Sequence, residues 1–238
     1  MNMKGVSGID VIQDIWGGFD FTYILSILLS VVPSLLCITF HELSHGYVAY
    51  RLGDDTAKRA GRLTLNPLKH IDPMGLLMMA VFHFGWAKPV PINMYRFKDP
   101  KKGMAVTALA GPVSNMILAF VFVFLYGALY QPLYRSAAGQ YLLQMLSLGA
   151  YISTGLAVFN LIPIPPLDGS KVLLAVLSDE NYEKLMRYER YGMLIMVALV
   201  ATGILGKPLT AAVSAVYSNV LLPVALSANR LVVNLFYR

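Results

Sequence analysis

Charged residues are scarce in this sequence of 238 residues, of which 13% are charged and 57% are hydrophobic. A soluble globular domain carries about 25% charged residues, so the composition excludes an ordinary water-soluble domain. The only cysteine is Cys37, which excludes an intramolecular disulfide and leaves the fold to side-chain packing. The first twenty residues carry Asp10, Asp14 and Asp20 rather than an unbroken apolar core, which argues against a cleavable signal peptide.

Five long stretches of the sequence contain no charged residue: 21–40, 103–134, 136–167, 191–206 and 208–229. A membrane-spanning helix needs about 20 apolar residues. Only the fourth stretch is shorter, and the tyrosines and cations at its ends can extend it to the membrane interface. The predicted fold class is therefore an all-α polytopic membrane protein with about five transmembrane helices. We expect a single membrane-embedded domain over 1–238, with its core at about 21–206 and no appended soluble domain.

The segment between the first two spans combines apolar and strand-like pieces. Residues 73–87 are uncharged, too short for a straight spanning helix and too apolar for water, so we expect a re-entrant loop. Residues 61–66 and 86–97 alternate in side-chain character, which predicts short β-strands flanking this loop. Pro89 and Pro91 make the second segment an edge strand, because proline cannot donate a ladder hydrogen bond.

The lysines and arginines are distributed unevenly between the loops. Residues 51–102 hold ten of the nineteen, and residues 171–190 hold four more. With five spans, both segments lie on one side together with Arg230 and Arg238, and the positive-inside rule places that side in the cytoplasm. We therefore expect a multi-pass protein of the cell membrane. Because the same rule already explains the basic loops, we expect no nucleic-acid partner.

The first uncharged stretch leads into His41-Glu42-Leu43-Ser44-His45. Two histidines four residues apart project from one face of a helix, close enough to bind one metal ion, and a glutamate between them suits a general base. The alternative is a pair of hydrogen-bonded core histidines. That alternative leaves Glu42 without a role, although an ionisable residue inside a membrane helix is costly and usually functional.

A catalytic zinc ion takes three protein ligands and keeps a position for water, so a third ligand is expected elsewhere in the chain. Asp168 is the leading candidate, because the prolines before it end the third span on the side where His41 lies. The alternative for Asp168 is an N-cap of a helix over 170–178. His70 and His83 are rival ligands, although neither has a spacing typical of metal sites.

With these motifs in order, the sequence resembles the site-2 protease family of intramembrane zinc metalloproteases. The resemblance runs from about Thr39 to Gly203 and is closest to the small bacterial or archaeal members, which lack PDZ and CBS domains. Six stretches carry it: 41–45, 61–67, 70–73, 84–91, 111–115 and 160–169.

The resemblance implies a zinc-dependent endopeptidase with one Zn²⁺ per chain. It implies that His41, His45 and Asp168 are the zinc ligands and that Glu42 is the catalytic base. The implied substrates are membrane-spanning proteins, whose helices are cut near the cytoplasmic face, so the active site lies toward the cytoplasm. The implied partners are these transmembrane substrates and the lipid bilayer. The sequence does not indicate which oligomeric state the protein has.

Two further residues of the spans, Asn115 and Cys37, carry side chains that can take part in chemistry. Asn115, near the start of the second span, can bind substrate or donate a hydrogen bond to the developing oxyanion, and an interhelical hydrogen bond explains it equally well. Cys37 lies four residues before His41 and faces the same way. We interpret it as a buried structural thiol.

Two other functions compete with proteolysis. A metal-ion channel or transporter also explains buried polar groups, and an inactive scaffold of the same fold retains the helices. The order His-Glu-x-x-His favours an enzyme, because its glutamate stands beside a metal-bound water. Residues 61–66 and 86–97 have two alternative roles. One of them pairs with an extended substrate by strand addition, or both merely brace the helix that carries His41 and His45.

Overall fold

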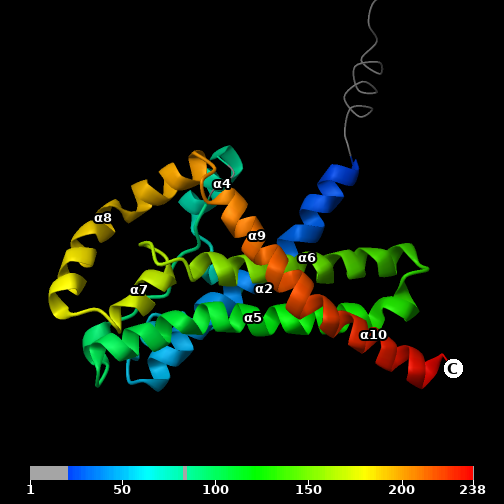
Figure 1. Ribbon diagram of the computed structural model, residues 1–238, viewed down its shortest axis with the longest axis horizontal. Coiled ribbons are helices and arrows are strands. Elements are labelled where there is room, and N and C mark those ends of the chain that lie inside the picture. The colour runs from blue at the N-terminus through cyan, green and yellow to red at the C-terminus, as the bar shows by residue number, and fades with distance from the viewer. Residues whose placement is uncertain (1–20, 83–84, 238) are drawn as a thin grey trace, which may run out of the picture.

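The computed structural model describes residues 21–82 and 85–237 of the chain. Its longest axis follows an antiparallel hairpin of two helices, α5 (Pro100–Leu133) and α6 (Ala137–Asn160), as Figure 1 shows. Each helix begins at a side-chain cap: Asp99 Oδ1 accepts a hydrogen bond from Lys102 N–H, and Ser136 Oγ accepts one from Gly139 N–H, both at 3.1 Å. Such caps stabilise a helix start by about 1 kcal/mol, so the sequence defines where both helices begin.

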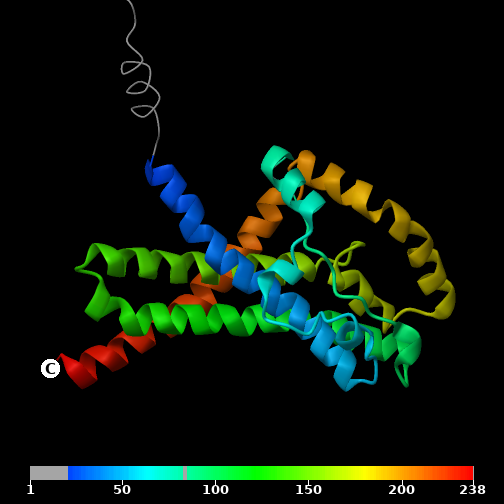
Figure 2. The ribbon, with the colours of Figure 1, turned by 180° about the vertical axis from the view of Figure 1, so that it is seen from behind.

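Two further elements cover opposite faces of this hairpin (Figures 1 and 2). One is α2 (Phe21–Arg51), which continues through Pro33. It ends close to Gly53, whose φ of +107° lies in the left-handed region that favours glycine. The other is a rod of α9 (Gly206–Val216), the π-helical turn η3 (Tyr217–Leu221) and α10 (Leu222–Phe236).

Small side chains let these helices approach closely. A buried cluster joins α2, α5, α6, η3 and α10, and its members are Cys37, Ala119, Phe122, Val123, Leu146, Ala150, Leu221 and Ala225. At Gly127 of α5, an added Cβ would lie 2.9 Å from Ala225 Cα and closer still to its carbonyl group, so α10 rests directly on the glycine. Such contacts are typical of membrane helices, which associate through packing rather than the hydrophobic effect.

Four helical segments in the described part of the chain are long and apolar enough to cross a membrane: Ile27–Arg51, Pro100–Leu133, Ala137–Asn160 and Gly206–Phe236. Large apolar side chains are exposed along them, among them Leu28, Ile117 and Leu235, each more than half exposed. So much exposed apolar surface is incompatible with water and suits lipid. The protein is therefore an all-α multi-pass membrane protein, as the sequence predicts.

The predicted span at 191–206 is not confirmed as a crossing helix. Its apolar residues form Tyr191–Ala201, the second part of α8 (Asp179–Ala201). This part is about 16 Å long at 1.5 Å per residue, against a hydrocarbon core of about 30 Å. The helix stops because Gly203 turns the chain with a φ of +70°. The last predicted span is correspondingly longer than expected and reaches from Gly206 to Phe236.

The predicted β-strands at 61–66 and 86–97 are wrong. Neither segment forms a strand. The second contains a single antiparallel bridge, from Ala87 to Ile71, and a 3-10 helix, η2 (Met94–Arg96). In the first segment, backbone N–H groups bond to nearby residues in local turns. In the second, Val90 and Asn93 donate their N–H groups to side chains of other elements, so they cannot join a strand ladder.

A ten-residue helix, α4 (Pro73–Phe82), occupies most of the predicted re-entrant loop, and residues 83 and 84 lie outside the described part. At about 15 Å, α4 is too short to cross a bilayer, as expected for this segment. Its insertion into the membrane as a re-entrant element stays a prediction.

Residues 86–97, which we call the strap, are tied to the end of α2. Asn93 N–H donates to Asp54 Oδ2 at 2.6 Å, and Arg62 Nη2 donates to the Lys88 carbonyl at 2.7 Å. Burial raises the pKa of the Asp54 carboxyl, but hydrogen bonds from Thr56 and from Asn93 N–H outweigh it and hold that pKa below its usual range. Together with the bond from Val90 N–H to Glu42 Oε2, these contacts hold the strap against α2 and the segment that follows it.

Candidate metal centre

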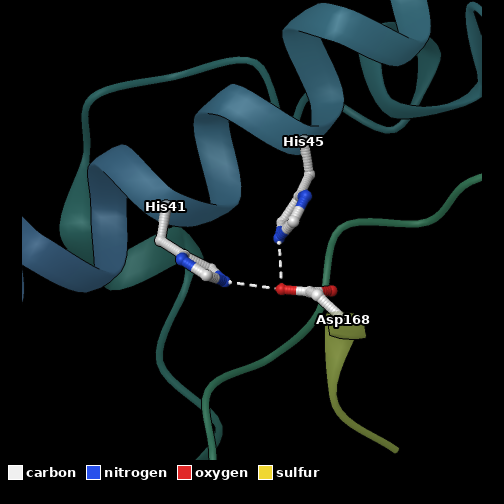
Figure 3. A group of neighbouring side chains, drawn as sticks. All are labelled: His41, His45 and Asp168. Atoms are coloured by element: carbon white, nitrogen blue, oxygen red, sulfur yellow. Dashed lines mark hydrogen bonds and ion pairs between the residues drawn. The ribbon is translucent and has the colours of Figure 1, made fainter. Parts of the chain in front are cut away.

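His41 and His45 lie one turn apart on α2 and project from the same face of the helix (Figure 3). Their ring centroids are 4.6 Å apart, with the ring planes nearly perpendicular. Both side chains are buried, although α2 also carries many exposed apolar side chains. The predicted histidine pair is therefore present and faces the interior of the protein.

Asp168 reaches this pair from a distant part of the sequence. It is the first residue of α7 (Asp168–Leu174), which follows the proline-containing loop 161–167 after α6. At Gly169 an added Cβ would lie 2.6 Å from the Ile162 carbonyl oxygen and nearer still to Leu161, so glycine lets this loop fold tightly against the end of α6. The loop thus directs the Asp168 carboxylate toward α2, as Figure 3 shows.

One carboxylate oxygen meets both histidines. Asp168 Oδ2 lies 3.0 Å from His41 Nε2 and 3.1 Å from His45 Nε2. Burial raises the pKa of the Asp168 carboxyl, but the hydrogen bonds from the two rings outweigh it and hold that pKa well below its usual range. Asp168 makes no side-chain cap for α7, whose N-cap is Leu167. The N-cap alternative is thereby excluded, and α7 ends at Leu174 rather than at residue 178.

The donor set suits a zinc ion. One ligand atom from each of the three residues lies within 4.8 Å of the others. Tetrahedral nitrogen and oxygen ligands at 2.0–2.2 Å from zinc stand about 3.3 Å apart, so small movements of the side chains would bring the three atoms around one ion. His45 Nδ1 lies 2.7 Å from the Thr107 carbonyl oxygen and donates its hydrogen there. In a neutral ring with its hydrogen on Nδ1, Nε2 carries a lone pair that can bind a metal in place of the contact with Asp168, as is usual for a histidine ligand.

Gly111 of α5 lies directly against the two rings. A Cβ at this position would stand 2.6 Å from Cε1 of either His41 or His45, and nearer still to His45 Nε2. Gly111 opens the stretch 111–115, but the sequence alone indicates no role for it. Its one signal is a glycine inside a helix, which costs about 1 kcal/mol relative to alanine and so suggests a packing reason.

Glu42 follows His41 on α2 and is held by the strap. Its Oε2 accepts the Val90 N–H at 2.9 Å, and its side chain is only partly buried. This bond fixes the orientation of the carboxylate beside the group of His41, His45 and Asp168. Sequence reasoning missed Val90, because a backbone N–H that meets a distant side chain leaves no sequence pattern.

Asn115 of α5 is fully buried and contacts the first histidine. Its Nδ2 lies 3.2 Å from His41 Nδ1, the ring nitrogen that does not face Asp168. Its main-chain carbonyl accepts a hydrogen bond from Ser153 Oγ at 2.8 Å. The structure thus brings Asn115 to the centre, and its predicted role as a donor to substrate or oxyanion stays a prediction.

The remaining candidates lie apart from the centre. His70 is buried elsewhere, with Nε2 3.0 Å from the Thr64 carbonyl oxygen, and the group of metal-binding side chains found among the described residues does not include it. His83 lies outside the described residues. Cys37 is buried in the helix core, where its Sγ lies 3.7 Å from the Gly149 carbonyl oxygen, in keeping with a structural thiol.

Comparison with known proteins gives a consistent result. The sequence model of peptidase family M50 matches residues 29–203. Similar proteins include YwhC of Bacillus subtilis (strain 168), 41% identical over 174 residues that cover 72% of this chain and 80% of YwhC. Rip2 of Mycolicibacterium smegmatis is 32% identical over 192 residues, or 78% of this chain and 71% of Rip2.

A third similar protein, MJ0611 of Methanocaldococcus jannaschii, is 33% identical over 160 residues, which cover 65% of this chain and 76% of MJ0611. All three proteins bear the name "Putative zinc metalloprotease". No solved structure matches the chain. The region matched by the family contains His41, His45 and Asp168.

Proposed function

The chain belongs to peptidase family M50, the site-2 protease family, and from this membership we propose that it is a zinc-dependent intramembrane endopeptidase. The resemblance drawn from the motifs is confirmed, and a membrane metalloprotease follows from it. One observation carries the finer proposal: Asp168 meets His41 and His45 of α2, and Glu42 directly follows His41. A histidine pair without catalysis would not need this glutamate.

The residues of the centre divide into ligands and base. His41, His45 and Asp168 would hold zinc, which when bound polarises a carbonyl group and acidifies a water molecule. Glu42 accepts a proton from the attacking water and delivers it to the leaving amide nitrogen. Val90 N–H holds Oε2 of Glu42, so the carboxylate keeps one orientation during both transfers. The attacking water first adds to the carbonyl carbon and forms the C–O bond. The C–N bond breaks afterwards, when the nitrogen has taken the proton from Glu42, so no covalent enzyme intermediate is needed.

The proposed substrates are membrane-spanning helices that are cut near the cytoplasmic face. A helix shields its own peptide bonds and must unwind locally, so glycine, proline or asparagine near the cleavage site should lower the cost of unwinding. The hydrogen bonds of the strap to Glu42 and Asp54 favour bracing over strand addition to the substrate. Residues 61–66 have no strand to offer either.

The test uses the purified full-length chain in liposomes with a single-span peptide as substrate. We expect zinc-dependent cleavage that stops when a chelator removes the metal and returns when zinc is added back. The same liposomes, loaded with a zinc-sensitive dye, report metal flux. Zinc flux without cleavage would favour the channel alternative, and neither activity would favour an inactive scaffold.

We propose that the metal centre faces the cytoplasm. With four spans, fifteen of the nineteen lysines and arginines lie on the side of the centre, and Lys4, Arg135, Arg230 and Arg238 lie on the other. Relative to the five-span expectation, Lys207 joins the centre's side and the two C-terminal arginines leave it. Figure 1 agrees with the new arrangement, because the C-terminus and the turn between α5 and α6 lie at the same end of the long axis, opposite α7.

Cysteine labelling tests this orientation. In intact cells, an impermeant maleimide should label Arg135→Cys and Tyr237→Cys, the latter just beyond the last span, and should label Lys98→Cys only after lysis. The natural Cys37 gives little background because it is fully buried. Labelling at 98 but not at 135 would show the opposite orientation, and labelling at 135 but not at 237 would favour five spans.

A further inference from the structure

A zinc ligand of the imidazole type needs a particular tautomer. The ring nitrogen that binds the metal offers a lone pair, and in the neutral ring the other nitrogen then carries the hydrogen and must donate it. His45 satisfies this requirement, since its Nδ1 donates to the Thr107 carbonyl oxygen at 2.7 Å. The following step rests on the proposed function, in which His41 also binds zinc through Nε2.

The partner of His41 Nδ1 is the amide of Asn115. The nitrogen end of that amide, Nδ2, lies 3.2 Å from His41 Nδ1. With zinc on Nε2, two hydrogen donors would face each other at a site that water does not reach, because Asn115 is 0% exposed. A buried contact of this kind gains no hydrogen bond and desolvates both groups.

The other end of the same amide lacks a partner. Asn115 Oδ1 is buried and accepts no hydrogen bond from any described residue. The two ends of a side-chain amide have nearly the same size, and the hydrogen-bond network decides which end points where. A half-turn of the amide exchanges them and offers His41 Nδ1–H the acceptor that it needs.

We propose that Asn115 is a positioning residue for the zinc ligand His41. In the zinc-loaded protein, Asn115 Oδ1 accepts the hydrogen of His41 Nδ1 and thereby keeps the lone pair of Nε2 directed at the metal. The hydrogen bond from Ser153 Oγ to the Asn115 carbonyl oxygen at 2.8 Å anchors this part of α5 against α6. Asn115 acts through His41 in this role and donates nothing to the substrate.

Zinc affinity, measured by competition with a chelator of known affinity, tests the proposal without any activity assay. Asn115→Leu, and the smaller Asn115→Ala, should weaken zinc binding about 10- to 100-fold, as does the loss of a residue that hydrogen-bonds a metal-binding histidine. Asn115→Asp should stay within a few-fold of the parent, because a carboxylate also accepts the Nδ1 hydrogen. Asn229→Leu is the matched control: it removes an interhelical bond to α5, from Nδ2 to the Gly127 carbonyl oxygen at 3.1 Å, and should leave zinc affinity unchanged.

The aspartate variant separates acceptor from donor. If Asn115→Leu and Asn115→Ala both bind zinc as tightly as the parent, or if Asn115→Asp loses as much affinity as they do, the proposal is overturned. If all three variants keep zinc but lose hydrolysis, Asn115 is instead a donor to the substrate or oxyanion. Failure of the proposed function has a different signature: the parent binds zinc and cuts no peptide, while the ranking of zinc affinities is unaffected.

Discussion

Replacing Glu42 with glutamine should reduce peptide hydrolysis by about 10²- to 10⁴-fold, the usual contribution of a general base, while zinc binding survives. The amide keeps the size of the side chain but cannot accept the proton of the attacking water. It also retains an oxygen that can accept the Val90 N–H, which in the parent lies 2.9 Å from Oε2. Cleavage of a single-span peptide and zinc content by atomic absorption are the two measurements.

Variants of the proposed ligands are the matched comparison. His41→Ala, His45→Ala and Asp168→Ala should lose both zinc and hydrolysis, because each removes one of the three donors that come together among the described residues. Substantial hydrolysis by the Glu42→Gln variant would refute the general-base assignment. Full zinc content in the Asp168→Ala variant would show that the third ligand lies elsewhere.

Gly111→Ala should abolish tight zinc binding, although it adds a single methyl group. That methyl would stand 2.6 Å from Cε1 of His41 and of His45, well inside the van der Waals distance of about 3.5–4.0 Å. The helices cannot simply separate, because α2 and α5 share the buried cluster around Cys37 and Ala119. The rings must therefore rotate away from Asp168, which disperses the ligand set. Equilibrium zinc competition and peptide cleavage measure the effect.

Gly155→Ala provides the control for this change. Gly155 lies inside α6, and nothing stands within 4 Å of a Cβ placed there. The variant should keep zinc and activity and gain up to about 1 kcal/mol of helix stability, since alanine is the better helix former. If Gly111→Ala binds zinc as tightly as Gly155→Ala, the contact between α5 and the two rings does not constrain the metal centre.

Much of the centre follows from the sequence because its logic is local or topological. The four-residue spacing of His41 and His45 puts both on one helix face whatever the rest of the fold does. Asp168 follows from counting spans, since a chain that crosses the membrane twice returns to the side of the first histidine. Apolar runs likewise indicate α5 and α6, whose starts at Asp99 and Ser136 carry cap residues.

The features that sequence reasoning missed depend on contacts between distant segments. The strap has the alternation of a strand, but Glu42 and Asp54 take the N–H groups that a ladder would need. Residues 191–206 have the composition of a span, but the helix ends at Ala201, before the run does. The roles of Gly111 and Val90 require knowing which helix or loop lies against α2, and no single-sequence pattern reports that.

The contact between Gly127 and α10 restricts which residue can stand at position 127. Gly127 lies within residues 29–203, the region shared with the family, whereas α10 begins at Leu222 and lies beyond it. The obstacle that a Cβ at 127 would meet is the backbone of Ala225, so no compensating side-chain change at position 225 can make room. A position inside the shared region is thus restricted to glycine, in this chain, by a helix that lies outside that region.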